Sequence, residues 1–117
     1  IFDGFQVARR IQNADIAVQN SELELDAIRL QLDANFASLI RTYQNQLELV
    51  RLEEENLTNA KESLEIAVER FRLGTISSLE FREAQQTLLD AENRWIIARY
   101  DAKVAETELL LLSGLLI

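Results

Sequence analysis

The sequence predicts an all-α fold, a long antiparallel helical hairpin (a coiled coil) with arms of unequal length. The 117 residues include no Pro and only three Gly, so the residues that usually interrupt helices and form loops are almost absent. Apolar residues recur at alternating spacings of three and four, which is the pattern of a left-handed coiled coil. A connection of only about four residues between two such helices forces them to be antiparallel.

The first helix is expected from about residue 5 to residue 72, because no helix breaker interrupts this stretch. The residues before it, Ile1-Phe2-Asp3-Gly4, are expected to form a short extended or turn segment. Gly74 lies where a left-handed cap would end the helix, and Arg70 and Arg72 suit the dipole of its last turn. One apolar row recurs every seven residues and two alanines occupy the row beside it: Phe36, Tyr43, Val50, Leu57, Leu64 and Phe71, with Ala60 and Ala67.

The second helix is expected from about residue 78 to residue 113, after a tip formed by residues 73–77. Ser77 and Glu80 have the spacing of a capping box. Ile76 and Phe81 have the spacing of the hydrophobic staple that accompanies such a box. Ser113-Gly114 provides the C-terminal stop. The predicted seam contains large residues and alanines at spacings of three and four: Phe81, Ala84, Leu88, Ala91, Trp95, Ala98, Ala102, Ala105, Leu109 and Leu112.

The two helices differ in length, and this mismatch leaves apolar residues without a partner. At about 1.5 Å per residue, the second helix spans about 50 Å and the first about 100 Å. The second helix therefore reaches back only to the region of Phe36 and Leu39. Two apolar rows lie largely upstream of that point: Ile11, Val18, Leu25, Leu32 and Leu39, and Ile16, Leu23, Leu30 and Ala37. Exposed rows of this length predict that the chain self-associates or packs against other helices.

Composition excludes several classes of function. The charge balance is 12 − 20 = −8, which argues against binding nucleic acid. The absence of Cys and His excludes thiol nucleophiles, ordinary zinc sites and His-based catalysis. Carboxylates such as Asp101 and Glu106 have no partner at ligand or acid–base spacing, so we expect no enzyme activity, metal or cofactor. The chain opens on Ile1 and has neither a signal peptide nor an apolar run of about 20 residues, as expected of an excised or processed segment.

Four motifs resemble the TolC-like outer-membrane efflux proteins, the exit ducts of tripartite efflux pumps and type I secretion systems. The opening Ile1-Phe2-Asp3-Gly4-Phe5 resembles the family's junction between a membrane strand and a long periplasmic helix. The segment from Arg70 to Glu80 resembles its hairpin tip. The stretch Ala84-Gln85-Gln86-Thr87-Leu88-Leu89-Asp90-Ala91 resembles its Ala-Gln-x-x-Leu-x-x-Ala repeat, and the segment from Leu109 to Gly114 resembles the close of that repeat.

This resemblance implies the periplasmic helical part of one repeat, a fragment of an α-barrel. In the family, three protomers form a tapered helical tunnel beneath a β-barrel in the outer membrane of a Gram-negative bacterium. The tunnel is a passive duct that works with an inner-membrane transporter and a periplasmic adaptor protein. Leu73, Gly74 and Thr75 match the tip that adaptor hairpins touch. A cap glycine would be expected in any such hairpin, so Gly74 also has a purely structural explanation.

The same resemblance implies an entrance or gating role around the tip, at Phe71, Ile76, Glu80 and Glu83. In the best-known pattern, a Tyr and an Arg at the first two of these positions latch the closed entrance. Phe71 has no hydroxyl group and Ile76 has no charge, so this polar latch does not carry over. Glu80 and Glu83 are also explained as a capping-box residue and a solvated acid at a helix start.

Two other interpretations remain open at this point. One is a structural coiled-coil scaffold, for which the caps and heptads suffice. The other is the helical hairpin of a periplasmic adaptor, although such hairpins have arms of similar length and an Arg-Leu-Ser tip. The acidic run from Glu53 to Glu55 interrupts the seam of the first helix. It is expected to be solvated, and the alternatives are that it faces a cation-selective lumen or holds the register of the helices. Trp95 is expected to pack in the seam, within reach of Tyr43.

Overall fold

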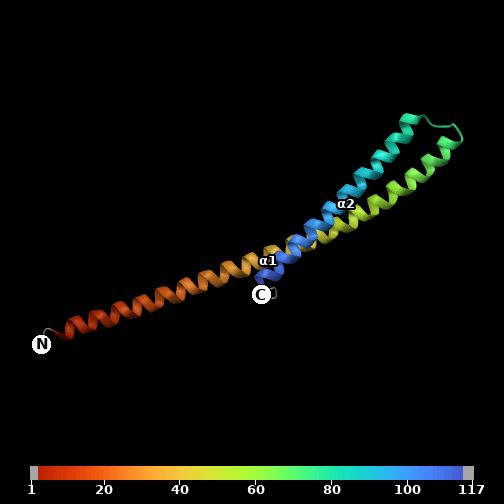
Figure 1. Cartoon of the computed structure of the whole chain (residues 1–117). Helices are drawn as coiled ribbons and strands as arrows, with labels where there is room; N and C mark the ends of the chain where they lie inside the picture. Colours follow the sequence, from red (N-terminus) through yellow and green to blue (C-terminus); the bar gives the residue numbers. More distant parts are fainter. Residues whose placement is uncertain (1–2, 115–117) are drawn as a thin grey trace. The chain divides into compact units, whose positions relative to one another are not determined.

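The computed structural model describes residues 3–114, and this part of the chain contains two α-helices and no β-strand (Figure 1). Helix α1 comprises Asp3–Arg72 and helix α2 comprises Ser78–Leu112, which are 70 and 35 residues long. The predicted all-α hairpin with unequal arms is confirmed. Across residues 3–114, neither helix has a stretch long and apolar enough to cross a membrane.

The N-terminus of α1 differs from the expectation. The helix already includes Asp3 and Gly4, so these two residues do not form an extended or turn segment. Ile1 and Phe2, the rest of that predicted segment, lie outside the described residues. Asp3 lies in the first turn, where a negative charge stabilises the helix dipole. A glycine costs only about 1 kcal/mol in a helix, which the long run of helix formers after Gly4 offsets.

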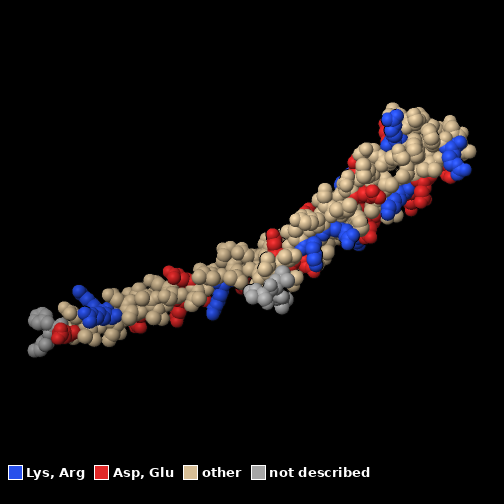
Figure 2. Space-filling model, in the orientation of Figure 1, with Lys and Arg blue, Asp and Glu red and all other residues tan. Residues whose placement is uncertain are grey.

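The chain divides into two compact units, residues 1–38 and residues 39–117. In the first unit, residues 3–38 belong to α1 and every side chain is exposed. The large apolar residues of both heptad rows are among them: Ile11, Ile16, Val18, Leu23, Leu25, Leu30 and Leu32. On the face visible in Figure 2, charged side chains of both signs are interspersed with uncharged surface.

The second unit is the hairpin itself. The cyan-to-blue helix α2 lies antiparallel beside the yellow-to-green part of α1 (Figure 1). The buried residues of the two helices all lie on the predicted seam: Leu57, Ala60 and Ala67 of α1, and Ala91, Ala98, Ala102 and Ala105 of α2. Most other seam positions are half-buried, whereas Phe71 and Leu112 are exposed. Because six of the seven buried residues are alanines, the two backbones can approach each other closely along the seam.

The packed centre of the hairpin is small. Leu57, Ala60 and Ala91 form one buried cluster, and Leu88 and Trp95 pack against it. Ala91 is the most buried of these, at 1% exposure. The guanidinium carbon of Arg99 lies 4.6 Å from the centroid of the Trp95 ring, which is a cation–π contact. Trp95 is therefore a packing residue, as predicted.

One residue of the acidic run, Glu53, is less exposed than expected. Glu54 and Glu55 are exposed, as expected, but Glu53 is half-buried on the seam. Its Oε2 atom lies 3.3 Å from Nε of Arg94 and accepts a second hydrogen bond from the Asn56 side chain at 3.3 Å. The reason is positional, because Glu53 falls on the same seven-residue row as Ala60, which faces α2.

Candidate functional site: the hairpin tip

The end of α1 is closed by a Schellman motif, the hydrogen-bonded turn that a left-handed glycine allows. The N–H of Thr75 donates to the carbonyl oxygen of Arg70 at 2.9 Å, and the N–H of Gly74 donates to that of Phe71 at 3.0 Å. The hydroxyl of Thr75 donates to the same Arg70 carbonyl at 2.9 Å. Gly74 has φ of +72°, a conformation that residues with a Cβ rarely adopt. The turn is thus held by backbone groups and one hydroxyl.

The surface of this turn includes a large apolar side chain beside a residue that has no side chain. Leu73 is 75% exposed. A Cβ atom added to Gly74 would have no heavy atom of the described residues within 4 Å, apart from those of its chain neighbours Leu73 and Thr75. The site therefore presents a leucine next to an uncovered glycine, with room for another molecule to approach the backbone.

The start of α2 is closed by the predicted capping box, which is confirmed. The Ser77 hydroxyl accepts from the N–H of Glu80 at 3.2 Å, and the N–H of Ser77 donates to Oε2 of Glu80 at 2.7 Å. The Ser77 hydroxyl also donates to the same oxygen at 2.9 Å. These two bonds, that from the backbone N–H first, lower the pKa of Glu80, and the positive charge of Arg70 contributes further. The carboxylate of Glu80 is therefore engaged in holding the helix end.

Two phenylalanines close the base of the turn. The rings of Phe71 and Phe81 are stacked, with centroids 4.9 Å apart and planes inclined by 16°. Ile76, the predicted staple partner of Phe81, is half-buried. The stack joins the last turn of α1 to the first turn of α2. Heptad reasoning put both residues on the seam, but it did not identify their mutual contact.

The seven predicted site residues fall into two groups. Leu73, Gly74, Thr75, Phe71, Ile76 and Glu80 form the turn and the helix ends that close it. Glu83 lies in α2 and is exposed, on the rim of a shallow groove that also includes Arg82, Gln86 and Leu89. Glu83 therefore takes no part in closing the turn.

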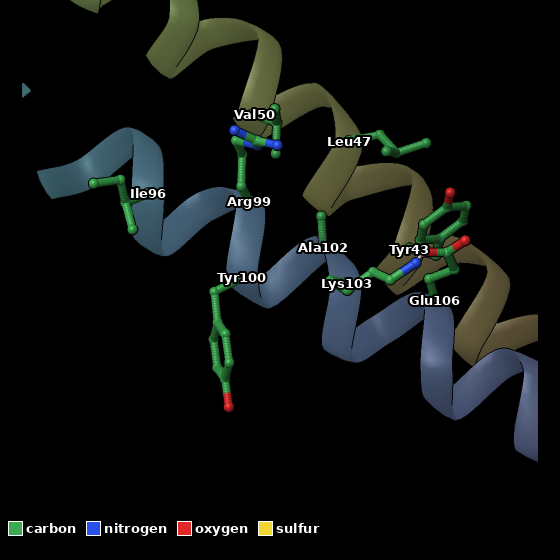
Figure 3. A pocket seen from close by; sticks show the side chains of 9 residues that line it. All are labelled: Tyr43, Leu47, Val50, Ile96, Arg99, Tyr100, Ala102, Lys103 and Glu106. Carbon is green, nitrogen blue, oxygen red and sulfur yellow. Dashed lines mark hydrogen bonds and ion pairs between the residues drawn. The ribbon is translucent and has the colours of Figure 1, made fainter. Parts of the chain in front are cut away.

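A second hollow lies along one side of the hairpin, away from the tip (Figure 3). It has a volume of about 440 Å³, and Val50 and Ala102 contribute to its apolar lining. Nζ of Lys103 lies 2.6 Å from Oε2 of Glu106, which raises the pKa of Lys103. Tyr43 lies beside this pair (Figure 3). Within residues 3–114, no group of three or more carboxylates is arranged to hold a metal ion.

The comparison with known families agrees with this geometry. The model of the family described as "Outer membrane efflux protein" matches residues 1–115. No curated protein and no solved structure matches the chain. The match is to the channel proteins themselves, whose role is transport across the outer membrane, and it confirms the resemblance carried by the tip and repeat motifs. The chain therefore belongs to the outer membrane efflux protein family.

Proposed function

We propose that this chain is a periplasmic segment of the tunnel wall in an outer-membrane efflux channel. Membership in the family makes it a component of such a channel. The two-helix architecture and the alanine-rich seam support the role of a wall, because closely packed helices can exclude solutes between them. The channel is a passive duct, so the segment needs shape and charge rather than reactive groups.

In this proposal the tip formed by Leu73, Gly74 and Thr75 docks the periplasmic adaptor protein. The observation that carries the proposal is the open Gly74, which leaves its backbone accessible beside the exposed Leu73. A helix tip of the partner could approach such a backbone closely, since no Cβ is in the way. The rigid closure of the turn on both sides supports docking without rearrangement, because little conformational entropy would be lost.

A role at the tunnel entrance is proposed for Phe71, Ile76, Glu80 and Glu83. Phe71 is occupied by its stack on Phe81, and Glu80 by the capping box. These contacts favour a structural role for both residues, in which they hold the entrance in shape. Glu83 is exposed and outside the cap, so it is the residue whose charge we assign to the entrance.

The assembled channel is proposed to be a homotrimer in the outer membrane of a Gram-negative bacterium, coupled through the adaptor to an inner-membrane transporter. The exposed rows of residues 11–37 support association with further helices. We propose that the isolated chain self-associates through the same rows.

The docking role can be tested in cells that express the complete channel subunit with its adaptor and transporter. Gly74→Trp places a large side chain on the open backbone, whereas Gly74→Ala adds a Cβ at the same φ of +72° without the bulk. We expect Gly74→Trp to abolish efflux and site-specific cross-linking to the adaptor, with normal subunit levels. Gly74→Ala should retain most of both.

Each outcome has a distinct meaning. Retained efflux and cross-linking in Gly74→Trp would remove Gly74 from the docking site. Equal loss in both variants would show that the left-handed turn, rather than the open surface, is what the channel requires. Either result would contradict adaptor docking on the bare Gly74 backbone.

A further inference from the structure

A carboxylate on the seam of the hairpin is unexpected, because this seam otherwise excludes charge. Glu53 continues the row that contains Leu39, Gln46, Ala60 and Ala67 at intervals of seven residues. Its side chain is only 14% exposed, whereas that of its partner Arg94 is 54% exposed. The more deeply placed member of the pair is thus the acid, and its neighbours on the row, Gln46 and Ala60, are both uncharged.

The pair with Arg94 is distinct from the other ion pairs of the hairpin. Within residues 3–114, it is the ion pair that joins α1 to α2; the remaining four each link residues three apart in one helix. A partly exposed pair contributes little stability, and replacement of a buried pair by apolar residues is often neutral or stabilising. Stability alone therefore does not account for Glu53.

The alignment of the two helices provides a better account. Ala84, Ala91 and Ala98 recur at intervals of seven along α2, so sliding α2 by seven residues would again place an alanine opposite Ala60. Alanine side chains are small and identical, so alanine layers pack almost equally well in the native and in the shifted alignments. The position of Arg94 is different, because Thr87 and Asp101 occupy the positions seven residues before and after it.

We propose that Glu53 selects the alignment of the hairpin through Arg94. A shift of seven residues in one direction would leave the carboxylate beside Thr87, with no positive charge. The same shift in the other direction would set it beside Asp101, where like charges repel. A polar group on a coiled-coil seam that fixes register at a cost in stability is an established use of such residues.

The selection has a consequence at the tip. A seven-residue slide moves the point where the chain turns by three to four residues, half the slide. Gly74 would then leave the turn, and the Schellman motif and capping box would be lost. The caps and Glu53 therefore favour the same alignment from two places in the hairpin.

Cysteine cross-linking can test this directly, since the chain has no native Cys. Ala60→Cys is combined in turn with Ala91→Cys, Ala84→Cys or Ala98→Cys, which report the native and the two shifted alignments. All chains carry Ser77→Ala. This change weakens the capping box, which also favours the native alignment, and so makes shifted species easier to detect. With Glu53 present, we expect the 60–91 product to dominate.

Glu53→Leu should lower the ratio of the 60–91 product to the shifted products by about tenfold, without lowering the melting temperature. The matched control is Glu48→Leu, which removes an acid paired with Arg51 inside α1 at 3.0 Å; it should leave the ratio unchanged. Exchange of the charges, Glu53→Arg with Arg94→Glu, should restore the 60–91 product over the 60–84 product. It should not restore it over the 60–98 product, because an arginine at position 53 would attract Asp101 in that alignment.

Four results would overturn the proposal. The first is an unchanged product ratio in Glu53→Leu. The second is a loss of helical content in that variant, which would make the pair a requirement for stability. The third is an equal effect of Glu48→Leu. The fourth is no recovery of the 60–91 product over the 60–84 product in the exchanged pair. Either of these last two results would separate the effect from the contact between Glu53 and Arg94.

Discussion

Leu57 is the large side chain at the centre of the buried cluster, and we expect its burial to contribute strongly to the stability of the hairpin. Leu57 is 7% exposed and packs with Ala60 and Ala91. Leu57→Ala removes three buried carbon atoms, a loss of about 2 kcal/mol at about 0.8 kcal/mol per carbon. The alanines beside it cannot extend into the space, so a residual cavity raises the expected loss to about 2–3 kcal/mol.

The change is measured by urea denaturation followed by far-ultraviolet circular dichroism. The matched control is Leu52→Ala on the same helix, because Leu52 is 52% exposed. We expect the control to lose no more than about 0.5 kcal/mol. A loss of 2–3 kcal/mol corresponds to a drop in melting temperature of roughly 10 °C or more for a unit of this size. Equal losses in the two variants would refute the assignment of the cluster as the core of the hairpin.

Three further outcomes follow from the caps and from the exposed rows. Ser77→Ala removes the hydroxyl of the N-cap and should lower the free energy of unfolding by about 1 kcal/mol in urea denaturation, whereas an unchanged value would contradict the cap. The pKa of Glu80 is lowered from 4.5 by the bonds from Ser77, so the contribution of this carboxylate is complete above pH 4.5 and is lost as the pH falls through the lower folded value. In an NMR titration, the Ser77 amide should report a midpoint below 4.5, and a midpoint above it would exclude the bond. Leu23→Glu combined with Leu30→Glu should reduce self-association in sedimentation experiments, whereas Glu24→Gln on the same segment should not; a wild-type chain that stays monomeric at high concentration would contradict the expectation.

The features that could be predicted from the sequence depend on residues close together in the chain. The capping box needs only Ser77 and Glu80, three residues apart, and the left-handed cap needs only Gly74 at the end of a helical run. The seam follows from a period of seven that repeats along each helix. The conformation of the tip was therefore accessible from sequence, including the placement of Leu73 and Thr75 beside the glycine.

The features that were missed depend on how the two helices are rotated against each other. The seven-residue row already placed Glu53 in line with Ala60, but its partner Arg94 lies 41 residues away in the chain. Runs of charged residues are usually solvated, and this rule gave the wrong result for Glu53. Its place on the seven-residue row that faces α2 determined its burial, even though its neighbours in the run are charged. The Phe71–Phe81 stack also depends on this rotation.

The two glycines at the boundaries of the second arm have nearly the same backbone conformation, with φ of +72° at Gly74 and +75° at Gly114. Each stop is encoded within a few residues and is independent of what lies between them. The distance from the tip to the end of the arm can therefore be changed in modular steps. Inserting one heptad into each helix of the hairpin would extend it by about 10 Å while keeping both stops intact. The length of such a hairpin is therefore set by the number of heptads between its two stops, and the tip can be moved further from the end of the arm without a change in either stop.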